Sequence, residues 1–116
     1  RRVLAIDDEP FILSSLGLIL GDTHEVVPAT DGTRAITLLA EDAQFDVILC
    51  DLMMHGMDGI GVYDAVQRLH PGLERRIVFM TGGVFSPRVR TFLGSVENRC
   101  LDKPFDEDGL RQAVER

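Results

Sequence analysis

The chain has 116 residues, a formal net charge of −7 and 45% hydrophobic residues. This length suits one domain with one core, and no apolar stretch approaches the roughly 18 residues that indicate a membrane span. The negative charge argues against direct nucleic-acid binding, because a phosphate backbone would be repelled. The charge either keeps the protein soluble or reflects carboxylates gathered at a cation site.

Neither the start of the chain nor its cysteines indicate secretion. The first residue is Arg rather than Met, so we expect a piece of a longer protein, and there is no signal-peptide pattern. Cys50 and Cys100 lie in apolar runs and form no Cys-x-x-Cys pair, which argues against a zinc or redox motif. Free cysteines are typical of a reducing compartment, so we expect the cytoplasm.

The first half of the chain predicts two strands and two helices. A strand is predicted over residues 3–6, and Pro10 then begins a helix. The apolar stripe of this helix is Ile12, Leu16, Ile19 and Leu20. A second strand is predicted over 25–27, and Asp31 is expected to cap a second helix.

The second half continues the alternation. A strand over 47–50 precedes a helix that Pro71 and Gly72 close, and a strand over 77–80 precedes a short helix begun by Ser86 and Pro87. A last strand over 99–101 leads to a helix that Asp106 introduces. The runs at 3–6, 47–50 and 77–80 are nearly continuous in apolar residues, as is typical of parallel strands covered on both faces.

This alternation predicts an α/β fold of the (βα)₅ type. Right-handed crossovers place helices on both faces of a five-stranded parallel sheet. In the doubly wound, flavodoxin-like order 2-1-3-4-5, the first and third strands lie side by side at the point where strand order reverses. We expect one domain over residues 1–116.

Polar residues follow four of the strands. Asp7 and Asp8 come after the first, Asp51 after the third, Thr81 after the fourth and Lys103 after the fifth. Each has a structural alternative: the first pair could cap a helix, and the others could be loop, turn and solvated residues. Because ligands gather at the carboxyl ends of parallel strands, their coincidence favours one shared site.

Three converging carboxylates would raise one another's pKa unless a cation intervened. Mg²⁺ suits such a site because it takes oxygen ligands, and the main-chain carbonyl of Met53 is a further candidate ligand. The Lys103 ammonium and the Thr81 hydroxyl could meet phosphoryl oxygens, and Asp51 could be a nucleophile toward phosphorus. No glycine-rich nucleotide-binding loop is present in the sequence.

Together these motifs resemble the receiver domain of bacterial two-component response regulators, over essentially the whole chain. The motifs are residues 3–9, 51–54, 57–59, 80–82 and 103–105. The resemblance implies that Asp51 accepts a phosphoryl group from the phosphohistidine of a histidine kinase or histidine phosphotransfer domain. It implies that Asp8, Asp51 and the Met53 carbonyl bind Mg²⁺, with Asp7 contributing through water.

The resemblance also implies how the signal leaves the domain. Thr81 and Lys103 would bind the phosphoryl group and report it to an output surface made of the fourth helix, fifth strand and fifth helix. That surface would contact a downstream output domain or protein. The Lys103–Pro104 bond would be cis. The run over residues 79–87 is similar to receivers fused to histidine kinases.

Two positions depart from the family pattern. His55 stands where the family usually has proline, and it could be a phosphate or metal ligand or a solvated loop residue. Cys100 stands at a switch position that is commonly aromatic, so the usual aromatic rotamer switch is not expected.

Two other functions remain open at this point. One is a magnesium-dependent phosphatase of the haloacid dehalogenase type, which also uses an aspartyl nucleophile. Such enzymes carry a DxDxT motif, and the second acid is missing from Asp51-Leu52-Met53. The other is a degenerate receiver that only binds a partner. The complete set of acids, threonine and lysine favours a phosphoacceptor domain over a free-standing enzyme or a degenerate receiver.

Overall fold

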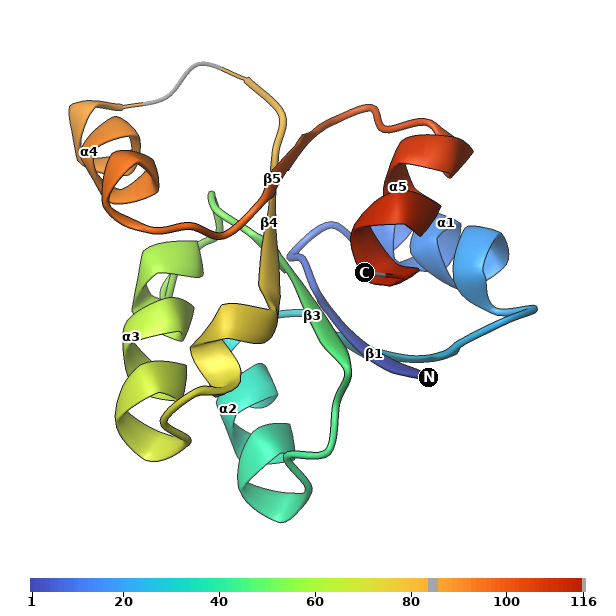
Figure 1. Ribbon diagram of the computed structural model, residues 1–116, viewed down its shortest axis with the longest axis horizontal. Coiled ribbons are helices and arrows are strands. Elements are labelled where there is room, and N and C mark those ends of the chain that lie inside the picture. Colours follow the sequence, from blue (N-terminus) through green and yellow to red (C-terminus); the bar gives the residue numbers. More distant parts are fainter. Residues whose placement is uncertain (84–85, 116) are drawn as a thin grey trace.

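A computed structural model describes residues 1–83 and 86–115, and it has one sheet of five parallel strands in the order β2-β1-β3-β4-β5 (Figure 1). The predicted α/β fold and strand order are confirmed. The strands are β1 (Arg2–Ile6), β2 (Glu25–Ala29), β3 (Val47–Asp51), β4 (Ile77–Thr81) and β5 (Cys100–Asp102). The helices are α1 (Pro10–Leu20), α2 (Gly32–Glu41), α3 (Gly59–Leu69), the short 3₁₀ helix η1 (Leu73–Arg76), α4 (Pro87–Ser95) and α5 (Glu107–Glu115).

Helices cover both faces of the sheet. The helices α1 and α5 lie on one face, and α2, α3 and α4 lie on the other (Figure 1). Successive residues of a strand point to opposite faces, so Leu4 packs under α2 and α3 while Val3 and Ala5 pack under α1 and α5. This two-sided burial is why the central strands are almost entirely apolar.

Three local features differ from the sequence-based expectation. The strand β2 continues through Pro28 to Ala29, and an edge strand tolerates a proline because one side of it has no hydrogen-bonding neighbour. In α1, Leu13 is buried with Leu16 and Leu20, so the core stripe is rotated from the predicted one. The helix η1 had no periodic signal because it is one turn long.

Side chains cap the N-termini of several helices. The predicted caps Asp31 and Ser86 are confirmed, since each side chain accepts from a main-chain N–H three residues later. Asp58 does the same for α3 by accepting from Gly61. The first residues of α1 receive no such bond from Glu9, their N-cap residue.

Gly59 lets α3 begin directly against the end of β3. A Cβ atom added there would lie 2.8 Å from the main-chain oxygen of Asp51 and 2.8 Å from Cα of Leu52. Both atoms are main chain, so the strand end would have to move. We expect Gly59→Ala to lower the free energy of unfolding by about 1–3 kcal/mol.

The matched control is Gly17, inside α1, where an added Cβ would meet nothing within 4 Å. Gly17→Ala should raise the free energy of unfolding by about 0.5–1 kcal/mol, because alanine loses less backbone entropy in a helix. Urea denaturation of both variants measures the difference. Equal effects of the two substitutions would contradict the close contact at Gly59.

Candidate functional site

Three carboxylates meet at the carboxyl end of the sheet. Asp7 and Asp8 follow β1, Asp51 ends β3, and one oxygen from each lies within 4.8 Å of the others. Asp7 and Asp51 are buried and Asp8 is partly exposed, so the cluster opens to solvent on the Asp8 side. Asp7 accepts from the N–H of Glu9, ahead of the helix, so this carboxylate orders the loop rather than capping α1.

Lys103 reaches this cluster from the end of β5. Its Nζ lies 2.6 Å from Oδ2 of Asp7 and 3.5 Å from Oδ1 of Asp51. The N–H of Lys103 donates to the carbonyl of Thr81, which ties the lysine to the end of β4. Burial opposes the charge of this lysine, but the hydrogen bond with Asp7 and the charges of Asp51 and Asp7 outweigh it and raise the lysine pKa.

The cluster carries more negative charge than Lys103 can balance. Burial first, and repulsion from Asp7 second, raise the pKa of Asp51 to about 6, although Lys103 acts in the opposite direction. Three carboxylates and one ammonium leave two negative charges when all are ionised. A divalent cation would balance them, and the oxygen-only donor set fits Mg²⁺.

Met53 lies beside the Asp51 carboxylate, and Thr81 ends the neighbouring strand. The N–H of Met53 lies 3.4 Å from Oδ1 of Asp51, so the chain turns back beside the carboxylate. Thr81 is buried at the end of β4, one residue beyond Met80, the register partner of Asp51. The site residues from four strand ends therefore lie at the same edge of the sheet.

His55 is exposed but not isolated, because its main-chain N–H and its ring nitrogen Nδ1 both contact Asp8. Cys100 packs at the edge of the core beside the aromatic cluster of Tyr63, Phe79 and Phe92. Burial and the charge of Asp102 raise the pKa of the Cys100 thiol.

Sequence reasoning missed one ion pair near the site. Arg88 in the first turn of α4 donates to Asp58 at 2.6 Å and so joins α4 to the loop that follows β3. The capping role of Asp58 could have been found from its place before a helix, but nothing in the sequence indicated its arginine partner. Of the run over residues 79–87, residues 84 and 85 lie outside the described residues.

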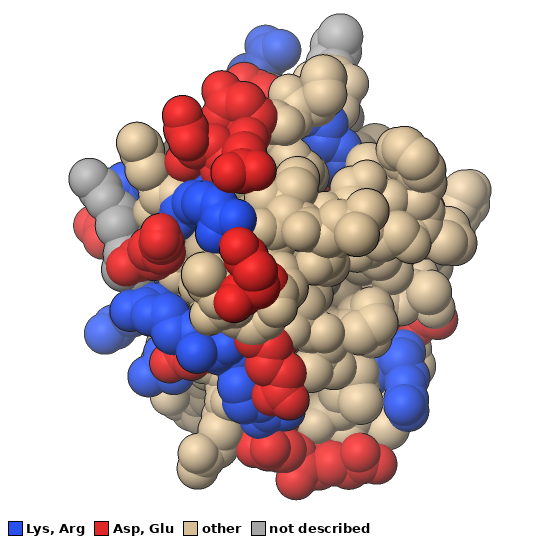
Figure 2. All heavy atoms as spheres, turned by 90° about the vertical axis from the view of Figure 1, so that its right-hand side faces the viewer, with Lys and Arg blue, Asp and Glu red and all other residues tan. Residues whose placement is uncertain are grey.

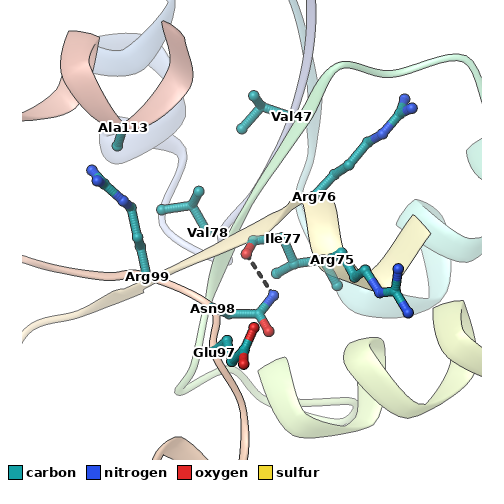
Figure 3. Close-up of a pocket in the computed structure, with 9 residues that line it drawn as sticks. All are labelled: Val47, Arg75, Arg76, Ile77, Val78, Glu97, Asn98, Arg99 and Ala113. Atoms are coloured by element: carbon teal, nitrogen blue, oxygen red, sulfur yellow. Dashed lines mark hydrogen bonds between the residues drawn. The ribbon is translucent and has the colours of Figure 1, made fainter. Parts of the chain in front are cut away.

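A pocket of about 310 Å³ lies at the opposite end of β4. Arg75 and Arg76 point away from Arg99 across it, so their guanidinium groups do not converge on a common ligand (Figure 3). Asn98 in its wall donates to the carbonyls of Glu74 and Ile77. The bonds of Asn98 give this region a structural role in holding the loop before β5.

A family model described as the response regulator receiver domain matches residues 3–115. The chain belongs to this family. A receiver domain of this kind is a part of two-component phosphorelay systems, which contain histidine kinases and response regulators. Within the described residues of this receiver, no helix is both long and apolar enough to span a membrane.

Similar proteins include both regulators and kinases. The transcriptional regulatory protein GlrR of Escherichia coli (strain K12) is 32% identical over 115 residues, which are 98% of this receiver and 25% of that protein. The signal transduction histidine-protein kinase BarA of the same organism is 28% identical over 114 residues, which are 98% of this receiver and 12% of the kinase. The receiver thus spans a quarter or less of these two relatives.

A solved structure agrees closely with this receiver. The chemotaxis protein CheY4 of Vibrio cholerae has a TM-score of 0.85 and 30% identity, over 99% of this receiver and 96% of that chain. The Lys103–Pro104 bond is cis in this receiver, as the resemblance implied.

Proposed function

We propose that this receiver accepts a phosphoryl group on Asp51 from the phosphohistidine of a histidine kinase or histidine phosphotransfer domain. The supporting observation is the difference between the three carboxylates. Asp7 is held by Lys103 at 2.6 Å, and Asp8 is held by His55 at 3.1 and 3.2 Å. Asp51 has only the longer contacts of 3.4 and 3.5 Å, both at Oδ1. Of the contacts that the three carboxylates make with the described residues, those of Asp51 are the longest, so its oxygens are the most available for attack.

The transfer makes one bond and breaks one. A carboxylate oxygen of Asp51 attacks phosphorus, the bond from phosphorus to the donor's imidazole nitrogen breaks, and the electron pair leaves with that nitrogen. The product is an acyl phosphate. Lys103 lies close enough to Asp51 to neutralise a phosphoryl oxygen, and the Thr81 hydroxyl is the second candidate partner.

Asp8, Asp51 and the Met53 carbonyl are the residues that would hold Mg²⁺, with Asp7 acting through water. When bound, Mg²⁺ would balance charge on the phosphoryl oxygens and orient them. Asp7 also holds Lys103 beside Asp51, so it serves the phosphoryl site and the metal site together.

The surface of α1 is suited to dock the phosphodonor. The helix α1 contains no charged residue, and it begins directly after the acidic loop with Phe11 and Leu18 largely exposed. Figure 2 shows this side of the molecule, where a broad surface without charged side chains lies beside a band of acidic and basic ones. An apolar helix next to the reacting carboxylate fits a donor that must bring its imidazole to Asp51.

The signal would leave through the surface formed by α4, β5 and α5. The Arg88–Asp58 ion pair joins α4 to the loop after β3, and Lys103 joins β5 to the site. With Cys100 in place of an aromatic residue, the rearrangement on phosphorylation should be small and centred on the loop from Gly82, part of which lies outside the described residues.

Phosphorylation with a small donor tests the proposed function. The receiver is incubated with acetyl phosphate and Mg²⁺, and intact-mass spectrometry follows the added phosphoryl group. Hydroxylamine should remove the group, because it cleaves acyl phosphates and spares phosphate esters. No added mass would favour a degenerate receiver, and turnover of a general phosphomonoester would favour a phosphatase.

The phosphorylated receiver should be long-lived for an acyl phosphate. Hydrolysis needs a water aligned with phosphorus, and the side chains that border its path are those of Met53 and Gly83 in the family pattern. A thioether and a hydrogen atom cannot orient water. Met53→Asn combined with Gly83→Gln should therefore shorten the half-life, measured as decay of labelled phosphoprotein in magnesium buffer. A double variant that decays no faster than the wild type would contradict this explanation.

A further inference from the structure

Two donors from His55 meet one oxygen of Asp8. The main-chain N–H of His55 lies 3.1 Å from Oδ2 of Asp8, and the ring nitrogen Nδ1 lies 3.2 Å from the same oxygen. An ionised carboxylate only accepts hydrogen bonds, so Nδ1 must carry a hydrogen in this contact. Since His55 and Asp8 lie 47 positions apart, the contact joins the loop after β3 to the loop after β1.

The two hydrogen bonds give the two oxygens of the Asp8 carboxylate different roles. Each carboxylate oxygen has two lone pairs, and both lone pairs of Oδ2 are used by His55. Oδ1 is then the oxygen of Asp8 with lone pairs left for a cation. A proline at position 55 would supply neither donor, because it has no N–H and no polar side chain.

We propose that His55 is a positioning residue for the divalent-cation site. His55 orients Asp8 through Oδ2 and leaves Oδ1 free to bind the metal. The inference rests on the proposed Mg²⁺ site. The Asp8 side chain is 24% exposed and lies at the open side of the cluster, whereas Asp7 and Asp51 are fixed by burial. Asp8 is therefore the ligand whose orientation gains most from an added restraint.

The first test is a Mg²⁺ titration of isotope-labelled protein, followed by amide chemical shifts, for His55→Pro and His55→Ala. His55→Pro removes both donors, and its dissociation constant for Mg²⁺ should rise about tenfold. His55→Ala keeps the main-chain N–H, so its dissociation constant should rise by a smaller factor. His70→Ala, at the far end of α3, controls for loss of a histidine elsewhere.

A matched pair of variants, His55→Asn and His55→Gln, distinguishes the hydrogen bond of Nδ1 from the packing of the side chain. The side-chain amide nitrogen of asparagine can take the place of Nδ1, whereas that of glutamine takes the place of Nε2. His55→Asn should therefore keep the affinity of the wild type, and His55→Gln should bind Mg²⁺ as weakly as His55→Ala. Both variants are expected to fold, which the amide spectrum verifies.

The position of the hydrogen on the His55 ring is a measurement that does not depend on Mg²⁺ affinity. Long-range proton–nitrogen spectra of the metal-free protein should show the hydrogen of His55 on Nδ1, and Asp8→Ala should abolish that preference. A ring with its hydrogen only on Nε2, or His55 variants that all bind within about twofold of the wild type, would overturn the inference.

Asp8→Ala also separates this inference from the proposed function. If Asp8→Ala loses Mg²⁺ while the His55 variants do not change, only the role of His55 is wrong. If Asp8→Ala binds Mg²⁺ as well as the wild type, the proposed metal site is wrong, and the inference falls with it.

Discussion

Replacing Asp51 with asparagine should abolish uptake of a phosphoryl group from acetyl phosphate and from a phosphorylated kinase. The amide has nearly the shape of the carboxylate but no negative oxygen to attack phosphorus. The substitution also removes repulsion from Asp7, which is the second cause of the raised pKa of Asp51, so the fold should persist. Intact-mass spectrometry of the treated variant measures the loss.

Asp58→Asn is the matched control for this experiment. Asp58 lies in the same loop and caps α3, and asparagine is also a good capping residue. This variant should be phosphorylated like the wild type. A phosphoryl group that persists in Asp51→Asn, or one that is lost from both variants, would show that Asp51 is not the specific acceptor.

Lys103→Met should lower the free energy of unfolding of the metal-free receiver by about 3 kcal/mol, because it leaves Asp7 buried without its counter-ion. Lys103 is the only lysine of the chain, its side chain is 13% exposed, and that of Asp7 is fully buried. Methionine keeps most of the apolar stem, so the loss reports the charge. Urea denaturation with a chelator measures it.

Two further variants test whether this loss of stability comes from the unpaired charge of Asp7. Adding Asp7→Asn to Lys103→Met should restore most of the stability, because the orphaned charge is removed. Arg88→Met breaks an ion pair whose arginine is 62% exposed, and it should cost about 1 kcal/mol or less. Equal losses for Lys103→Met and Arg88→Met would contradict the buried pair. The Lys103→Met variant should still bind Mg²⁺, but its output surface should rearrange little on phosphorylation, because the charge of Lys103 would contact the phosphoryl group rather than the metal.

The amino-acid sequence by itself determined the fold, and it predicted which residues form the candidate site. Continuous apolar runs such as residues 47–50 indicate strands buried on both faces, and their alternation with helical stripes leaves few possible topologies. Because parallel strands end at one edge, the polar residues that follow them are gathered by topology alone. Asp7, Asp8, Asp51, Thr81 and Lys103 could therefore be identified without coordinates.

Only the tertiary structure decided how these side chains pair. The Nζ atom of Lys103 lies 2.6 Å from a carboxylate oxygen of Asp7 and 3.5 Å from one of Asp51, so its main partner is Asp7. Asp58 pairs with Arg88. His55 contacts Asp8 across two loops. Periodicity describes which face of an element is buried, whereas the rotamer of a long side chain and the path of a loop depend on neighbours that are distant in sequence. Those contacts exist only once the strand ends have been brought together.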